Sequence, residues 1–195
     1  MEGSRRLPHP QWERLGNLGQ ALEERRSIRS FSRKQLEEGT ISIILAAANG
    51  VTDTGQGLRT APSGGACYPL DTYLVSAAGV EEYVPEEHSL TTVRESDVRA
   101  ELARHAYQQA CLAEAPVTVA ICADYHRITG RYGRRGIRYA ILEAGHIAQN
   151  IHLAAASLGL GSVAVGAFDD DSVAAALGVE GSPLYLIPVG IPATV

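Results

Sequence analysis

The stretch RYGRRGIRYAILEAGHIAQNIHLAAASLGLGSVAVGAFDD, which runs from Arg131 to Asp170, predicts the centre of the fold. Good helix formers dominate from Tyr139 to Leu158, with no proline and one interior glycine, so a long helix is expected there. Apolar residues fall on every side of this helix, a pattern typical of a helix that is buried all round. Its many small side chains would let neighbouring backbones come close. We therefore expect the helix to lie at the interface of an obligate homodimer.

One polar stripe interrupts the apolar surface of this helix, formed by Tyr139, Glu143, His146 and Asn150 at helical spacing. These side chains are interpreted as buried polar groups that satisfy one another or a neighbouring loop. The alternative is a metal site, because a Glu-x-x-His pair occurs in di-iron helical bundles. Such a site needs a second pair and two further glutamates on facing helices. No second pair is found, so no metal is expected.

Composition predicts one globular domain over residues 1–195, with residues 1–10 as a loose N-terminal segment. The net charge of −5 and the lack of basic blocks argue against nucleic acid as a partner. No apolar run approaches the roughly 18 residues of a membrane span, and no signal-peptide pattern opens the chain. The sequence contains three cysteines, and their spacing is not that of metal ligands. An odd number of cysteines is expected of a protein with free thiols in a reducing cytoplasm. The three are Cys67, Cys111 and Cys122.

Periodicity and turn residues predict the remaining elements. Helices are expected at Gln11–Arg25, Thr40–Ala48, Ser96–Ala113 and Asp171–Leu177. Strands are expected at Asp71–Ala77, Pro116–Ala123, Ser162–Ala167 and Leu184–Val189, of which Pro116–Ala123 is apolar throughout and therefore internal to a sheet. Residues 49–57 and 79–90 are interpreted as a loop and a polar connection. Four strands separated by helices predict an α+β fold with helices on both faces of the sheet.

Two short segments carry residues suited to an anionic ligand. The first holds Arg25, Arg26 and Arg29 around Ser27, and guanidinium groups bind phosphate oxygens bidentately. The second is the turn Pro62-Ser63-Gly64-Gly65, whose glycines would allow backbone N–H groups to approach a ligand closely. The plain alternatives are a solvated basic patch and an ordinary loop.

Taken together with the long helix, these segments make the chain resemble the flavin-dependent nitroreductase superfamily, and within it the branch of thiazole- and oxazole-forming dehydrogenases. The resemblance runs from about Leu22 to Gly190. The motifs that carry it are Arg25-Arg26-Ser27-Ile28-Arg29-Ser30-Phe31, Thr60-Ala61-Pro62-Ser63-Gly64-Gly65-Ala66-Cys67-Tyr68-Pro69, Arg138-Tyr139, Glu143-Ala144-Gly145-His146, Gln149-Asn150, Gly159-Leu160-Gly161, Val165-Gly166-Ala167-Phe168-Asp169-Asp170 and Pro188-Val189-Gly190.

The resemblance implies a mostly antiparallel sheet and a homodimer that binds two FMN molecules at its interface, each contacted by both chains. It implies that the phosphate, ribityl chain and pyrimidine edge of FMN contact Arg25, Arg26, Ser27 and Arg29. The partner's loop would reach the flavin through Pro62, Ser63, Gly64 and Gly65, and the strand beside flavin N5 would be Ala164, Val165, Gly166 and Ala167. The family's usual chemistry is ping-pong hydride transfer, with NAD(P)H as the expected donor.

Three positions depart from the family pattern. Ile191 stands where a basic residue commonly follows Pro-Val-Gly, so the phosphate must depend on the Arg25–Arg29 segment. Arg131 and Tyr132, the candidate catalytic pair, align with a Lys-Tyr pair implicated as acid/base in the azoline dehydrogenases, but arginine is a poor proton shuttle. Cys67 replaces a larger aliphatic residue and is interpreted as an inert thiol rather than a reactive one.

Three functions follow from this comparison. The first is an FMN-dependent oxidoreductase that takes electrons from NAD(P)H and reduces nitroaromatics, quinones or related small acceptors. The second is a dehydrogenase that oxidises a peptide heterocycle or another organic substrate with oxygen as acceptor. The third is a flavin-binding protein without turnover. The arginine- and glycine-rich loop between His126 and Gly136 is either a cover over the flavin that selects acceptors or a solvated connection.

Overall fold

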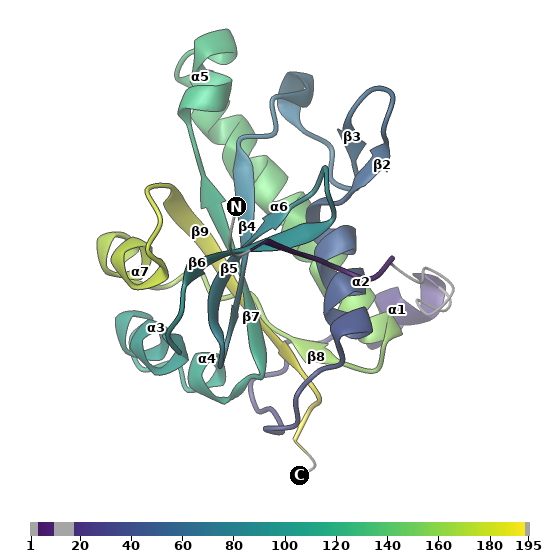
Figure 1. Ribbon diagram of the computed structural model, residues 1–195, viewed down its shortest axis with the longest axis vertical. Helices are drawn as coiled ribbons and strands as arrows, with labels where there is room; N and C mark the ends of the chain where they lie inside the picture. Colours follow the sequence, from purple (N-terminus) through teal and green to yellow (C-terminus); the bar gives the residue numbers. More distant parts are fainter. Residues whose placement is uncertain (1–3, 10–17, 194–195) are drawn as a thin grey trace.

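The computed structural model describes residues 4–9 and 18–193 and contains a seven-stranded sheet in which every pairing is antiparallel (Figure 1). Its strands, in spatial order, are β1 (Ser4–Arg6), β6 (Ser89–Arg94), β5 (Gly79–Val84), β4 (Leu70–Ser76), β7 (Val117–Ala123), β9 (Ser182–Gly190) and β8 (Gly161–Ser162). Every residue of β7 is buried, as its apolar sequence predicts. The α+β class and the antiparallel sheet are confirmed.

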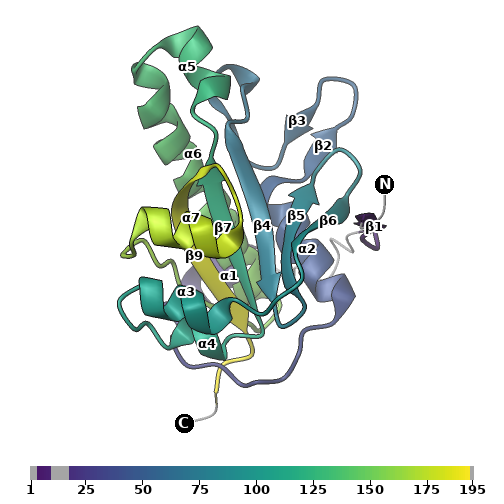
Figure 2. The same cartoon turned by 60° about the vertical axis from the view of Figure 1, so that its left-hand side comes forward.

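Helices cover both faces of this sheet (Figure 2). The helices of the first face are α2 (Glu38–Asn49) and α6 (Arg135–Ser157), and α1 (Leu18–Glu24) packs on α6. The helices of the second face are α3 (Arg99–His105), α4 (Cys111–Glu114) and α7 (Asp170–Leu177). A further helix, α5 (His126–Tyr132), joins β7 to α6, so the predicted loop between His126 and Gly136 is mostly helical.

Each face of the sheet has its own hydrophobic core, because successive side chains of a strand point to opposite sides. On β4, Leu74 packs in the core under α2 and α6, whereas Tyr73 and Val75 pack in the core under α3, α4 and α7. The long helix α6 contributes Ala140, Ala144, Ile147, Ala148, Ile151, Ala154 and Ala155 to the first core.

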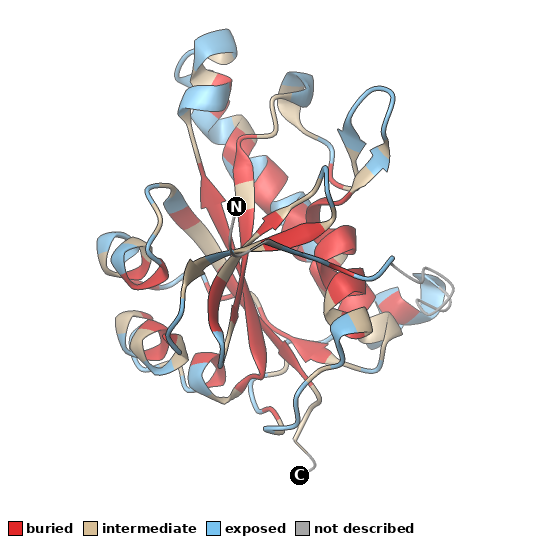
Figure 3. Ribbon diagram, viewed as in Figure 1, coloured by how far each residue is buried: buried red, intermediate tan, exposed pale blue. Residues whose placement is uncertain are grey.

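The long predicted helix is confirmed, and it begins four residues earlier and ends one residue earlier than expected. Burial on all sides is wrong for the single chain, because only the side that faces the sheet is covered (Figure 3). On the opposite side Ile141 and Leu142 are 52% and 53% exposed. The polar stripe is also divided: Glu143 is buried, whereas His146 is exposed.

The polar connection predicted for residues 79–90 is wrong, because this segment forms β5 and the start of β6. A register shift between Val80 and Glu81 interrupts the pairing of the two strands. The shift breaks the strict alternation of apolar and polar residues by which a strand is recognised in a sequence. Tyr83 and Leu90 nevertheless lie in the core.

Two other predicted elements are shorter or divided. The helix expected at Ser96–Ala113 is split into α3 and α4 by a turn in which Tyr107 and Gln108 have positive φ angles of 55° and 64°. The strand expected at Ser162–Ala167 pairs regularly only over β8, and beyond it a single bridge joins Val165 to Leu186.

The N-terminal predictions are tested only in part. Within the segment 1–10, residues 4–6 are not loose, because they pair with β6 as β1. The predicted helix Gln11–Arg25 is seen as α1, and its residues 11–17 lie outside the described part of the chain. The loop expected at residues 49–57 contains β2 (Val51–Asp53), which pairs with β3 (Leu58–Arg59). No helix in the described ranges is long and apolar enough to cross a membrane.

Gly79 provides a test of this fold, because it starts β5 at a φ of 136° and its missing side chain leaves room for the carbonyl group of Arg94. We expect Gly79→Ala to lower the free energy of unfolding by about 2 kcal/mol or more, through backbone strain and steric overlap. Urea denaturation followed by circular dichroism measures the change. The control is Gly130→Ala, at an open position in α5, which should be neutral or slightly stabilising. Equal stability of both variants would contradict the geometry of the β5–β6 hairpin.

Candidate functional site

The arginine-rich segment Arg25–Arg29 lies along the edge strand β8. Ser27 pairs with Ser162 in a parallel bridge, and the Ile28 N–H donates to the Ser162 carbonyl oxygen at 3.0 Å. A side chain at Gly161 would lie within 2.9 Å of three Ile28 atoms, so this close approach requires glycine. The segment is therefore held in a fixed, extended position beside the sheet.

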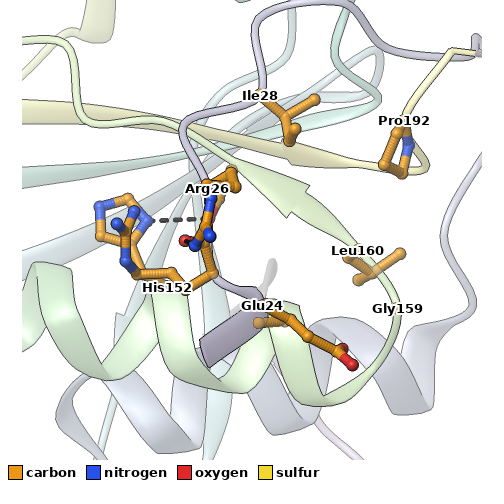
Figure 4. Close-up of a pocket in the computed structure, with 10 residues that line it drawn as sticks. Glu24, Arg26, Ile28, His152, Gly159, Leu160 and Pro192 are labelled. Atoms are coloured by element: carbon orange, nitrogen blue, oxygen red, sulfur yellow. Dashed lines mark hydrogen bonds between the residues drawn. The ribbon is translucent and has the colours of Figure 1, made fainter. Parts of the chain in front are cut away.

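A cavity of about 190 Å³ opens between this segment and the C-terminal half of α6 (Figure 4). Two of the predicted cofactor-binding residues, Arg25 and Arg26, line it. The other lining residues are Glu24, Ile28, His152, Ala156, Gly159, Leu160, Ser162 and Pro192. Ser27 and Arg29 are exposed and do not line the cavity.

The polar residues that line this cavity are two arginines, a histidine and a serine, together with one acidic residue, Glu24. His152 Nδ1 lies 2.8 Å from the Ser162 hydroxyl, and Arg26 Nη1 donates to the carbonyl oxygens of Glu23 and Arg25 at 2.8 Å. Burial lowers the pKa of His152, and the nearby Arg25 guanidinium lowers it further, so the imidazole is neutral near pH 7. Two arginines, an imidazole and a hydroxyl form a donor set that fits a phosphate monoester.

The segment Ala164–Ala167 continues from β8 along β9. Val165 is buried and exchanges two backbone hydrogen bonds of 2.9 Å with Leu186. Gly166 and Ala167 are exposed, and the Ala167 carbonyl oxygen accepts from Gln109 Nε2 at 3.1 Å. The backbone of this segment is thus anchored at Val165 and exposed at Gly166 and Ala167, and it follows Ser162, which pairs with Ser27 of the arginine-rich segment.

The turn Pro62–Gly65 is fixed by contacts from several elements. After the turn, the Tyr68 N–H donates back to the Ser63 hydroxyl oxygen at 2.9 Å. Before it, Thr60 donates to the Ala46 carbonyl oxygen at 3.1 Å and accepts from Asn150 Nδ2 at 3.3 Å. Asn150 thus hydrogen-bonds a carbonyl group of a neighbouring segment, as expected for the polar stripe of α6.

The predicted catalytic residues Arg131 and Tyr132 lie directly against this turn. Arg131 Nη1 donates to the Gly65 carbonyl oxygen at 2.9 Å, and a side chain at Gly65 would overlap the Tyr132 hydroxyl. The Tyr132 ring also meets the Tyr139 ring edge-on, with centroids 5.1 Å apart. Arg131 therefore holds the turn in place, a task that a permanently charged guanidinium performs well, and it does not resemble a proton carrier.

Beneath the turn lies Glu143, a buried carboxyl group on α6 that is 2% exposed. The Ser63 hydroxyl is close but is not placed for a hydrogen bond, and neither Glu143 oxygen has a hydrogen-bond partner among the described residues. Burial raises the pKa of Glu143 to about 7, against smaller lowering effects of Ser63 and Arg59. The Arg59 guanidinium is engaged elsewhere, 2.7 Å from Glu86 and over the Tyr68 ring.

The two halves of the predicted cofactor site lie near opposite ends of α6. Tyr139 contacts Gly64 of the turn, whereas His152 lines the cavity beside Arg25. His152 lies thirteen positions after Tyr139, which corresponds to about 20 Å along a helix axis. One chain therefore does not bring the turn Pro62–Gly65 to the Arg25–Arg29 segment.

Some features of the site have no clear signal in the sequence. His152 and Ser162 contribute to the cavity, and their pairing depends on how α6 returns to the sheet. Arg59 lies close enough to Glu143 to lower its pKa, although the two residues are far apart in the sequence. Within the described ranges, no group of three or more His, Cys, Asp or Glu side chains is arranged to hold a metal ion.

Known proteins with similar sequences indicate the family of this chain. Residues 22–191 match the sequence pattern of the nitroreductase family. The chain belongs to that family. The Methanocaldococcus jannaschii protein "Putative nitroreductase MJ1384" is 45% identical over 179 residues, which cover 89% of this chain and 90% of that protein. The Escherichia coli "Microcin B17-processing protein McbC" is 26% identical over 178 residues, which cover 79% of this chain and 65% of McbC.

Solved structures of other proteins share the fold. A crystal structure titled as a putative nitroreductase from Ralstonia eutropha superposes with a TM-score of 0.91 at 28% identity, covering 100% of this chain and 91% of that one. The Vibrio harveyi NADPH:FMN oxidoreductase, solved with NAD+, gives a TM-score of 0.69 at 22% identity, covering 92% of this chain and 70% of that one. The second likeness concerns the fold alone.

Glu143 makes the stability of the protein depend on pH. Its pKa rises from 4.5 to about 7 on folding, so the folded state binds this proton more tightly than the unfolded chain does. The contribution of Glu143 to stability is therefore present below pH 4.5 and is lost as the pH rises through 7, by on the order of 2 to 3 kcal/mol. Glu143→Gln should remove this part of the pH dependence.

Urea unfolding of the wild type and of Glu143→Gln, measured at intervals from pH 4.5 to pH 8, checks this expectation. Glu95→Gln, which changes an exposed carboxylate on a loop, is the matched control and should follow the wild type. If the free energy of unfolding of Glu143→Gln falls with pH as steeply as that of the wild type, a group other than Glu143 binds the proton.

Proposed function

We propose that this chain is an FMN-dependent oxidoreductase that takes a hydride from NAD(P)H and passes it, in a ping-pong reaction, to a small organic acceptor such as a nitroaromatic or a quinone. In this proposal residues 1–195 act as one FMN-binding domain. The observation that carries the proposal is the cavity lined by Arg25, Arg26, His152 and Ser162, because the chain runs on from Ser162 to Gly166 and Ala167, which are exposed. Membership of the nitroreductase family supports flavin-dependent redox chemistry at this cavity.

The proposal assigns distinct tasks to the residues of this chain. Arg25 and Arg26 bind the FMN phosphate, with His152 and Ser162 as further donors. Ser27 and Arg29, on the exposed side of the same segment, contact the ribityl chain and the pyrimidine edge. The exposed backbone at Gly166 would offer polar groups to the flavin ring and help to orient the donor. FMN, when bound, supplies the redox chemistry.

The separation of the two half-sites supports a homodimer. A twofold axis that crosses α6 near its middle would bring the turn Pro62–Gly65 of one protomer to the Arg25–Arg29 segment of the other. Gly145 lies close to that point, is exposed and has open space around it. The exposed Ile141 and Leu142 beside it, with Leu18 and Leu22 of α1, provide an apolar surface that association would bury.

A dehydrogenase that oxidises a peptide heterocycle or another organic substrate is the second candidate. Similarity to McbC favours it, as does the Tyr132 hydroxyl, which lies at Gly65 of the turn. Arg131 weighs against it, because its guanidinium holds the Gly65 carbonyl oxygen and stays protonated.

Anaerobic stopped-flow mixing of the FMN-loaded protein with NADH and with NADPH tests the first candidate. The flavin absorbance should bleach with at least one nicotinamide and recover when a quinone or a nitroaromatic is added. Bleaching without recovery would exclude these acceptors. Absence of bleaching with both donors would leave the dehydrogenase or a flavin-binding protein without turnover.

The arginine segment gives a prediction for cofactor binding. Arg25→Ala combined with Arg29→Ala should release FMN, because two charge-assisted contacts to the cofactor are lost, each corresponding to about 1.5 to 3 kcal/mol. Flavin content after desalting is the measurement. The variant should keep the wild-type mass of two 20.7 kDa chains, since apolar burial drives association. Full flavin occupancy in the variant would refute the assigned phosphate contact.

A further inference from the structure

A strongly basic surface lies where α5 meets α6. The sequence contains no Asp or Glu between Asp124 and Glu143, and three arginines of this interval, Arg134, Arg135 and Arg138, are exposed. We refer to these three residues as the basic arm. The rest of the chain is acidic enough to give a net charge of −5, so the basic arm stands out from its surroundings.

The charges of the basic arm are not neutralised within the described chain. No ion pair to Arg134, Arg135 or Arg138 is found among residues 4–9 and 18–193. Arg135 only stacks over the Tyr139 ring, at 5.7 Å. Nearby Arg127 is different, because Asp71 accepts two hydrogen bonds from it, of 2.7 and 2.6 Å, and Asp124 a third.

This concentration of positive charge is unfavourable in the protein alone. Arg134, which precedes α6 as its N-cap, and Arg138 are four residues apart, so two like charges lie close together at the start of the helix. The first turn of α6 has no acidic residue, although the positive end of a helix favours anions over cations. A bound anion would offset both the repulsion between the arginines and their unfavourable position at the helix start. Pairs of guanidinium groups bind phosphate groups especially well.

The basic arm also lies beside the candidate site. Arg131, one turn before Arg134 and Arg135, donates to the Gly65 carbonyl oxygen of the turn Pro62–Gly65. Figures 1 and 2 show α5 and the first turns of α6 extending past the end of the sheet. A ligand gripped by the arm would therefore extend from solvent toward that turn.

We propose that the basic arm binds the phosphomonoester of a phosphorylated nicotinamide dinucleotide, and hence that the donor is NADPH rather than NADH. The inference rests on the proposed function and deepens it. The two dinucleotides differ by one phosphate group, and Arg134 and Arg138 offer two guanidinium groups for that dianion. NADH lacks the group that these arginines bind.

Isothermal titration calorimetry of the purified protein with 2′,5′-ADP tests the binding step without any hydride transfer. We expect the dissociation constant to rise about tenfold or more in Arg134→Ala combined with Arg138→Ala, because charge-assisted contacts to phosphate are lost. The matched control is Arg104→Ala, which removes an exposed arginine of α3 and should bind like the wild type. An unchanged dissociation constant in the double variant would overturn the proposal.

Steady-state kinetics then test the choice of donor. The ratio of kcat/KM for NADPH to that for NADH should fall about tenfold in the double variant and stay constant in Arg104→Ala. An unchanged ratio would overturn the proposal, and so would loss of the dimer in the double variant, because the arm would then pair with the partner's carboxylates. If arm-dependent binding of 2′,5′-ADP is found but neither dinucleotide reduces the flavin, the proposed function fails while the phosphate site stands.

Discussion

The packing of α6 against the antiparallel sheet is the constraint on which the rest of the structure depends. Its covered side supplies the core of one face, and the same helix fixes both halves of the candidate site. Near its start it supports the turn Pro62–Gly65 through Tyr139 and Glu143, and near its end it forms a cavity wall with His152. A shift of α6 along its axis would displace both halves at once.

The elements whose local sequence pattern is uniform are predictable from the sequence. The apolar run of β7 and the helix-forming run of α6 each have one periodicity, so their existence and type were predictable. The β5–β6 hairpin was missed because the shift between Val80 and Glu81 interrupts its alternation. The split between α3 and α4 was missed because Tyr107 and Gln108 adopt left-handed conformations that glycine usually provides.

Residue types identified part of the candidate site, but the spatial relations within it came only from the structure. Arg25 and Arg26 were predicted as phosphate ligands from their chemistry, and both line the cavity. The sequence could not show that Arg131 holds the carbonyl group of Gly65, or that Glu143 lies under the same turn without a hydrogen-bond partner. Such contacts join residues that are far apart in the chain, so local patterns do not encode them.

The two outermost strands of the sheet are its shortest. β1 and β8 are three and two residues long, and past β8 an isolated bridge joins the backbone to β9 at Val165. A short edge offers few free N–H and C=O groups to a strand of another molecule, and this limits growth of the sheet by strand addition. These short edges fit the proposed homodimer, in which two copies meet through their helical surfaces and the assembly ends at two chains.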